Sequence, residues 1–114
     1  MSAESIKRYK LEIDNLFSAL PLNITSKSMF GGYGYYFDGK IFALITSEPQ
    51  LYFKADSISK EYFEKYGCYQ FIYKGHHHKK PTAMPYWSFP EQVKNDKALL
   101  IEYIERSANL SVRK

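Results

Sequence analysis

The sequence predicts an α+β fold, in which an antiparallel β-sheet of about five to six strands is flanked by N-terminal, middle and C-terminal helices. Three observations lead to this prediction: an N-terminal apolar stripe with helical spacing, a central glycine- and aromatic-rich stretch containing an Asp-Gly pair, and short apolar runs separated by turn residues. A chain of 114 residues can bury one core but is too small for two. Residues 1–114 are therefore expected to form a single domain.

The first expected element is an amphipathic helix near the N-terminus. Its apolar residues recur at steps of three and four, at Ile6, Tyr9, Ile13, Leu16, Phe17 and Leu20. Ser2 can cap the start of this helix, and Glu4 suits the positive end of the helix dipole. Pro21 is expected to end it, and an extended segment over residues 26–30 should follow.

The stretch from Met29 to Ile45, MFGGYGYYFDGKIFALI, predicts a β-hairpin. Asp38-Gly39 is typical of a two-residue type I′ turn, which requires positive φ at both positions. Three glycines precede this turn, at Gly31, Gly32 and Gly34. They match neither phosphate-binding glycine pattern, since they enter a strand rather than a helix, and we expect them to form a turn or a bulge.

A two-residue turn also fixes the expected register of the hairpin. Its cross-strand pairs would be Phe37 with Lys40, Tyr36 with Ile41, Tyr35 with Phe42 and Gly34 with Ala43. One face would then carry Tyr35, Phe37, Phe42 and Leu44, and the other Tyr36, Ile41, Ala43 and Ile45. Both faces are apolar. One is expected to carry the helices, and the other to be covered by more of the chain, a second subunit or a partner.

Shorter elements are expected in the second half of the chain. After a turn at residues 47–50, a strand at 51–54 should precede a short helix that is capped by Asp56 or Ser57 and closed by Gly67. This helix would carry Ile58, Tyr62, Phe63 and Tyr66. A strand at 69–73, a polar loop at 75–81 and a strand at 84–87 follow, and Pro85 suggests that the last of these lies at a sheet edge.

Two capping patterns are expected near the C-terminus. Residues 88–91, Ser-Phe-Pro-Glu, resemble a capping box that opens a helical turn. Asn95 or Asp96 should cap a last helix, whose apolar positions are Leu100, Tyr103, Ile104 and Ala108.

Taken in order, several motifs of the chain resemble the N-terminal domain of the TfoX/Sxy family of bacterial competence regulators. They are Met29-Phe30-Gly31-Gly32, Gly34, Tyr36-Phe37-Asp38-Gly39-Lys40, Phe42-Ala43-Leu44, Leu51-Tyr52-Phe53-Lys54, Phe71-x-Tyr73, Pro81, Met84, Tyr86 and Pro90. The resemblance spans roughly residues 5–108. It implies a secretion-chaperone-like α+β fold and a link to regulators that act with the cyclic-AMP receptor protein at competence promoters.

The same resemblance bears on domain organisation. Full-length competence regulators carry a second, helical C-terminal domain, whereas this chain ends at Lys114, soon after its last expected helix. We therefore expect a stand-alone N-terminal domain of this type.

Composition constrains the setting of the protein. The net charge is +4, and the basic residues are dispersed apart from a small cluster at Lys74, Lys79 and Lys80. Cys68 is the single cysteine, so no intrachain disulfide can form, which suits a reducing cytosol. The N-terminus lacks the apolar core of a signal peptide, and no apolar run reaches membrane-spanning length. The expected location is cytoplasmic.

Few residues in the chain indicate catalytic or metal chemistry. His76-His77-His78 is the metal-like feature, but three consecutive histidines do not supply the four tetrahedral ligands of a structural zinc site, and we interpret them as a solvated loop. Cys68 lies beside tyrosines rather than a base, which favours a structural thiol. We therefore expect no catalytic residues, no metal and no cofactor.

A binding role is the preferred functional hypothesis. The candidate interaction surface consists of Tyr35, Phe37, Tyr52, Lys54, Lys79, Lys80 and Trp87. The leading interpretation is a non-enzymatic module that binds another protein through the sheet and its edge, either a transcription regulator or a second copy of itself. The first alternative is a weak nucleic-acid-binding domain, because basic and aromatic side chains together can stack single-stranded bases. The second is an uncharacterised enzyme or metal-binding protein that uses the histidine loop.

Overall fold

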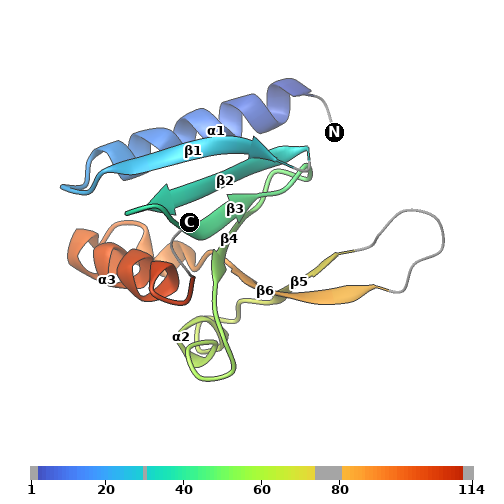
Figure 1. The fold of residues 1–114 in the computed structure, drawn as a ribbon, viewed down its shortest axis with the longest axis vertical. Helices are drawn as coiled ribbons and strands as arrows, with labels where there is room; N and C mark the ends of the chain where they lie inside the picture. The colour runs from blue at the N-terminus through green and yellow to red at the C-terminus, as the bar shows by residue number, and fades with distance from the viewer. Residues whose placement is uncertain (1–2, 30, 74–80, 112–114) are drawn as a thin grey trace.

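The computed structural model describes residues 3–29, 31–73 and 81–111. Its elements are α1 (Ala3–Ser18), β1 (Ile24–Met29), β2 (Gly32–Phe37), β3 (Lys40–Ile45), β4 (Leu51–Lys54), α2 (Glu61–Glu64), β5 (Gln70–Tyr73), β6 (Thr82–Ser88), the 3-10 helix η1 (Glu91–Val93) and α3 (Lys97–Ala108). The six strands form one sheet in the order β1-β2-β3-β4-β6-β5, and every neighbouring pair is antiparallel (Figure 1). The predicted α+β fold is confirmed.

A continuous chain of aromatic rings connects the three α-helices to one face of the sheet. Phe17 of α1 lies 5.0 Å from the ring of Tyr35 on β2 and 6.4 Å from that of Phe53 on β4. Phe53 lies 6.4 Å from Phe63 of α2, which in turn lies 5.4 Å from Tyr103 of α3. These side chains belong to one buried cluster. The helices therefore form one layer and the sheet the other.

The hairpin register agrees with the prediction only next to the turn. Phe37 pairs with Lys40 and Tyr36 with Ile41 as expected, but a register shift follows, and Tyr35 pairs with Ala43 rather than with Phe42. The cause is a β-bulge, in which two residues of one strand oppose a single residue of its partner. Phe42 is the additional residue of β3. The expected pairing of Gly34 with Ala43 is wrong for the same reason, since Gly34 pairs with Leu44.

The bulge also changes which side chains share a face. Strict alternation would place Phe42 and Ala43 on opposite faces, yet both are fully buried in the helix-covered core. Ile45 is buried in the same core, whereas Leu44 is half-buried and lies outside it. The predicted grouping of Phe42 with Leu44 is therefore wrong. A bulge lets two adjacent apolar side chains turn inward together.

The middle helix is shorter than expected. A hydrogen-bonded turn precedes α2, and the carboxylate of Asp56 caps this turn by accepting backbone N–H bonds from Ile58 and Ser59 at 3.0 and 2.7 Å. These bonds, led by that from Ser59, lower the pKa of Asp56. Gly67 closes the segment with a φ of 77°, as predicted.

Two predictions near the C-terminus are wrong and one is confirmed. Pro85 does not mark an edge, because β6 lies between β4 and β5; the ring sits where the β5–β6 pairing is irregular. The expected capping box does not form, since the Ser88 hydroxyl accepts a bond from the backbone of Tyr69 and η1 begins without a side-chain cap. Asp96 caps α3 by accepting from Leu99 at 3.1 Å. The proposed Ser2 cap lies outside the described residues.

We predict that Gly39→Val destabilises the protein by about 1–3 kcal/mol. Asp38 and Gly39 have φ values of 54° and 74°, which confirms a turn with positive φ at both positions, and a β-branched residue is strained there. The free energy of unfolding from chemical denaturation measures the effect. Gly39→Asn is the control and should cost less, because asparagine tolerates this conformation. An unchanged midpoint for the valine variant would contradict the assignment.

Candidate interaction surface

The sheet has a second face that the helices do not cover. Successive side chains of a strand point to opposite faces of the sheet. Phe53 on β4 and Trp87 on β6 point into the core. Their strand neighbours therefore point to the opposite face: Tyr52, Lys54 and Tyr86. Residues that pair directly across neighbouring strands share a face, so the pairing identifies the residues of β1, β2 and β3 that lie on this same face. We call it the open face and define it by Lys27, Met29, Tyr36, Ile41, Leu44, Tyr52, Lys54 and Tyr86. None of them belongs to the buried cluster on the helical side.

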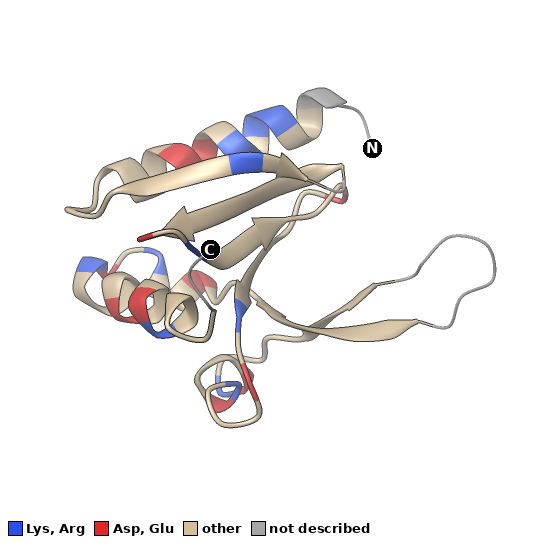
Figure 2. Ribbon diagram, viewed as in Figure 1, with Lys and Arg blue, Asp and Glu red and all other residues tan. Residues whose placement is uncertain are grey.

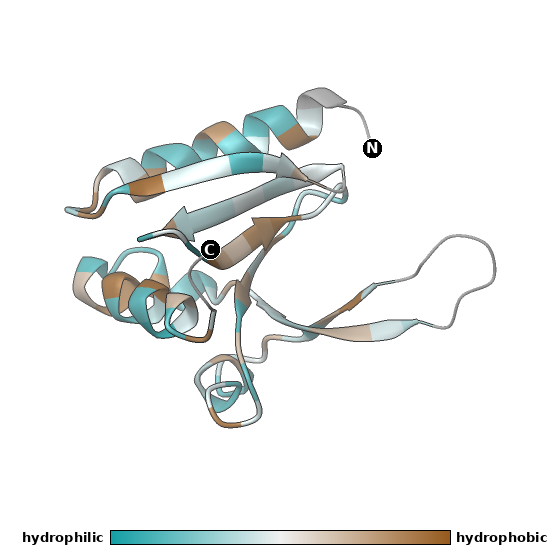
Figure 3. Cartoon of the chain, in the orientation of Figure 1, coloured by the Kyte–Doolittle hydropathy of each residue, from teal (hydrophilic) through white to brown (hydrophobic). Residues whose placement is uncertain are grey.

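Side chains of the open face pack laterally on one another. Gly34 of β2 provides the space for this: a Cβ atom at this position would lie 2.8 Å from the Met29 sulfur and 3.2 Å from Ile41 Cδ1. Gly34 is thus a close-approach glycine, and the predicted turn or bulge role for it is wrong; among the three glycines, positive φ occurs at Gly31. The packing produces an apolar floor around β3, a strand that Figure 3 colours as hydrophobic, in which Ile41 and Leu44 are half-buried.

Aromatic side chains border this floor toward β5. The ring of Tyr52 lies 4.9 Å from that of Phe71 and 6.1 Å from that of Tyr69. Exposed apolar side chains continue on this side at Tyr69, just before β5, and at Tyr73 within it, whereas Ile72 alternates with Phe71 to the other side. The apolar surface therefore extends from the centre of the open face to an outer strand of the sheet.

The structure separates the residues of the predicted interaction surface. Tyr35 and Trp87 are 1% and 8% exposed and belong to the core, so their side chains contribute to stability rather than to the surface. Phe37 is half-buried and packs against the same core. Lys54 is half-buried on the open face, and Tyr52 lies on the same side but is only 7% exposed, while Lys79 and Lys80 fall outside the described residues. An aromatic run such as Tyr33–Phe37 does not reveal which of its members point inward.

Charge is distributed unevenly between the two layers. The strands contain Lys27, Lys40 and Lys54 and no Asp or Glu, as Figure 2 shows. Lys54 Nζ donates to the Ser111 hydroxyl at 2.8 Å, and this hydroxyl donates to the Ile41 carbonyl at 2.7 Å. Burial lowers the pKa of Lys54. Sequence reasoning did not find Lys27 as a surface residue, although the absence of acidic residues from the strand segments is a signal that could have done so.

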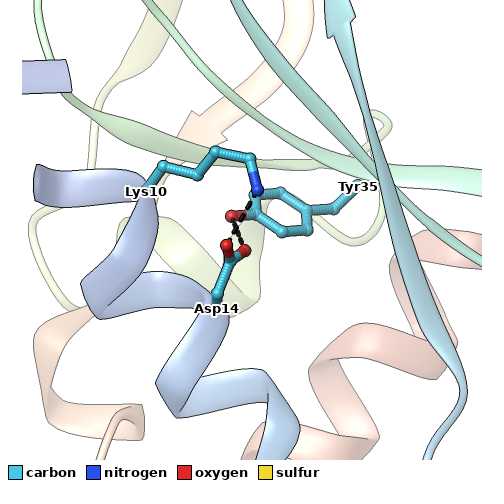
Figure 4. Close-up of polar contacts among 3 residues, drawn as sticks. All are labelled: Lys10, Asp14 and Tyr35. Atoms are coloured by element: carbon cyan, nitrogen blue, oxygen red, sulfur yellow. Dashed lines mark hydrogen bonds and ion pairs between the residues drawn. The ribbon is translucent and has the colours of Figure 1, made fainter. Parts of the chain in front are cut away.

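On the helical side, a polar cluster holds α1 against β2 (Figure 4). The carboxylate of Asp14 accepts bonds from Lys10 Nζ at 2.8 Å and from the Tyr35 hydroxyl at 2.7 Å. Lys10 Nζ also lies 5.0 Å from the centre of the Tyr33 ring. Burial, followed by the bond to Asp14, raises the pKa of Tyr35. The hydroxyl therefore stays protonated and acts as a structural donor.

Other titratable groups are also shifted toward their neutral forms. Burial raises the pKa of the Cys68 thiol, which keeps it protonated and weakly nucleophilic at neutral pH. Burial raises the pKa of Tyr86 and of Tyr103 to about 12. Within the described ranges, no three His, Cys, Asp or Glu side chains are grouped as metal ligands. The histidines at 76–78 lie outside these ranges.

We predict that Tyr35→Phe lowers the free energy of unfolding by about 1–2 kcal/mol, because a buried hydrogen bond to a charged acceptor is lost. Asp14→Ala should cost about 1–3 kcal/mol, since it leaves the Tyr35 hydroxyl buried without its acceptor. Urea denaturation measures both. Tyr33→Phe, for which the structure gives no hydroxyl hydrogen bond, is the control and should change stability little. Equal effects of Tyr35→Phe and this control would contradict the role assigned to the cluster.

None of the helices in the described part of the chain combines the length and apolarity that a membrane crossing requires.

Comparison with known proteins identifies the family of the chain. No curated protein matches the sequence. The pattern of the TfoX N-terminal domain matches residues 15–110, which include all six strands of the sheet and α3. The chain therefore belongs to the TfoX N-terminal domain family.

Proposed function

We propose that this domain is a non-enzymatic, regulator-like module that binds a partner protein through the open face of its sheet. Membership of a family of competence regulators supports the regulatory context. The observation that carries the proposal is the uncovered apolar centre of the open face, at Met29, Ile41 and Leu44, opposite a sheet face that three helices pack against. An apolar sheet face that the chain itself does not use for packing is typical of an interaction site.

The size of the open face limits the kind of complex it can form. The five strands that carry the open face, β1 to β4 and β6, lie about 4.8 Å apart and are each about 17 Å long, which gives an area of roughly 400 Å². A stable interface buries about 800 Å² on each partner. The partner would therefore extend onto the exposed rings of Tyr69, just before β5, and Tyr73, within it, or bind transiently. The first arrangement uses the sheet together with its outer strand.

At the centre of the open face, ring exposure favours a protein over a nucleic acid as the partner, whereas the exposed rings of Tyr69 and Tyr73 at β5 suit either ligand. Base stacking needs an accessible ring face, and Tyr52 and Tyr86 are each only 7% exposed. The aliphatic side chains Ile41 and Leu44 suit contact with apolar protein side chains instead. Single-stranded DNA is therefore the comparison ligand in the peptide-binding test below.

We predict that Leu44→Asp abolishes partner binding, because it places a charge at the centre of the apolar floor. The protein, carrying a cross-linker, is incubated with a native cell extract, and captured proteins are quantified by mass spectrometry. Leu11→Asp is the matched control: Leu11 is 61% exposed on α1, in the helical layer. Thermal melting checks that both variants fold.

The informative proteins are those that wild type and Leu11→Asp capture and Leu44→Asp does not. Their capture should persist at raised salt, since apolar contacts are not screened. If folded Leu44→Asp captures the same proteins as wild type, the open face is not the binding site.

A further inference from the structure

The two layers of the protein differ in how their charges are neutralised. None of the 12 acidic residues of the chain lies in a strand. The ion pairs between described side chains all involve helical elements: Lys10–Asp14, Lys94–Glu12, Lys94–Glu91 and Arg106–Glu102. By contrast, Lys27 and Lys54 on the open face have no carboxylate partner in the described part of the chain. Their described contacts are with the Tyr36 ring at 5.4 Å and the Ser111 hydroxyl at 2.8 Å.

This distribution argues against a second copy as the occupant of the open face. A two-fold interface places the same patch on both sides, so each copy would bring Lys27 and Lys54 and no acidic strand residue. Desolvating like charges without counter-charges is unfavourable. A partner with acidic groups at its rim, in contrast, would supply the carboxylates that the strand lysines lack.

The distance between Lys27 and Lys54 across the sheet is close to the width of an α-helix. Lys27 is on β1 and Lys54 on β4, three strands away, which corresponds to about 14 Å across the sheet. An α-helix with its side chains is about 10–12 Å wide. A helix lying between the lysines would rest on Ile41 and Leu44 and present its flanks to the two ammonium groups.

We propose that the open face binds an acidic amphipathic helix of a partner protein, whose apolar stripe contacts Ile41 and Leu44 and whose flanking carboxylates pair with Lys27 and Lys54. This inference rests on the proposed function, in which the open face binds protein. It adds the chemistry of the partner: carboxylates on both flanks of one apolar helix face. It also gives a role to Lys27, whose described contact within the fold is the Tyr36 ring.

The test uses two synthetic helical peptides of about 18 residues, or about five turns. Both carry the same leucine stripe, flanked by glutamates in one peptide and by lysines in the other. Fluorescence anisotropy should show that the glutamate peptide binds wild type at least about tenfold more tightly than the lysine peptide. Lys27→Glu/Lys54→Glu should weaken binding of the glutamate peptide by about fivefold or more and strengthen that of the lysine peptide.

Lys7→Glu/Lys97→Glu, which reverses two exposed helical lysines, is the matched control and should leave the peptide preference unchanged. Because Lys54 also bonds Ser111, Lys27→Glu alone is tested as well; Lys27 is exposed and its reversal should be tolerated. Thermal melting verifies the folding of each variant.

Several outcomes would overturn the inference: equal binding of the two peptides, no binding of either, or tighter binding of single-stranded DNA than of the glutamate peptide. So would a wild-type dimer in sedimentation velocity that Leu44→Asp dissociates. These failures are distinct from failure of the proposed function, which would appear as capture of the cellular partner that is insensitive to Leu44→Asp.

Discussion

The bulge in β3 is the constraint on which the two-layer arrangement of this domain depends. It turns Phe42 and Ala43 inward together and returns the strand to alternation with Leu44 outward and Ile45 inward. With regular pairing, either the bulky Phe42 or the pair Ala43 and Ile45 would leave the core. The bulge thus supplies the helices with a ring to pack on, and it places Leu44 at the centre of the open face.

The aromatic chain that begins at this strand explains why the helices cover one face only. Phe42 and Phe53 on adjacent strands contact Phe17 of α1. Phe53 also contacts Phe63 of α2, whose ring packs against Tyr103 of α3. Each ring buries a large apolar area against its neighbours, so a helix on the other face would have to give up these contacts. The polar cluster at Asp14 fixes the position of α1 relative to β2, because the Asp14 carboxylate accepts a hydrogen bond from the Tyr35 hydroxyl at the edge of the same core.

The positions of the helices, strands and turns could be predicted from the sequence better than the sheet face on which each side chain lies. Helical spacing located α1 and α3, and Asp-Gly located the hairpin turn, because these signals are local. Tyr35 was placed at the surface because a run of aromatic residues has no polar member to mark the outward side. The bulge was missed because it depends on which neighbour Phe42 packs against, which is a tertiary property. Pro85 suggested an edge, although an irregular pairing also tolerates a residue without an N–H. Tyr52 and Lys54 are the predicted surface residues that the structure places on the open face.

The charge distribution follows from the same division into layers. A carboxylate on a helix surface can find a lysine one turn away, as Asp14 finds Lys10, so acidic residues there are neutralised locally. A carboxylate on a central strand, β2, β3 or β4, where every residue is at least half-buried, would face either the packed aromatic core or the apolar floor, and in both places it would lose hydration without gaining a partner. Lysine differs, because its apolar stem can lie along the floor while its ammonium group contacts water or the face of an aromatic ring, as that of Lys27 does over Tyr36. The central strands of this sheet therefore disfavour carboxylates. In the proposed complex, the partner supplies the carboxylates that the open face lacks.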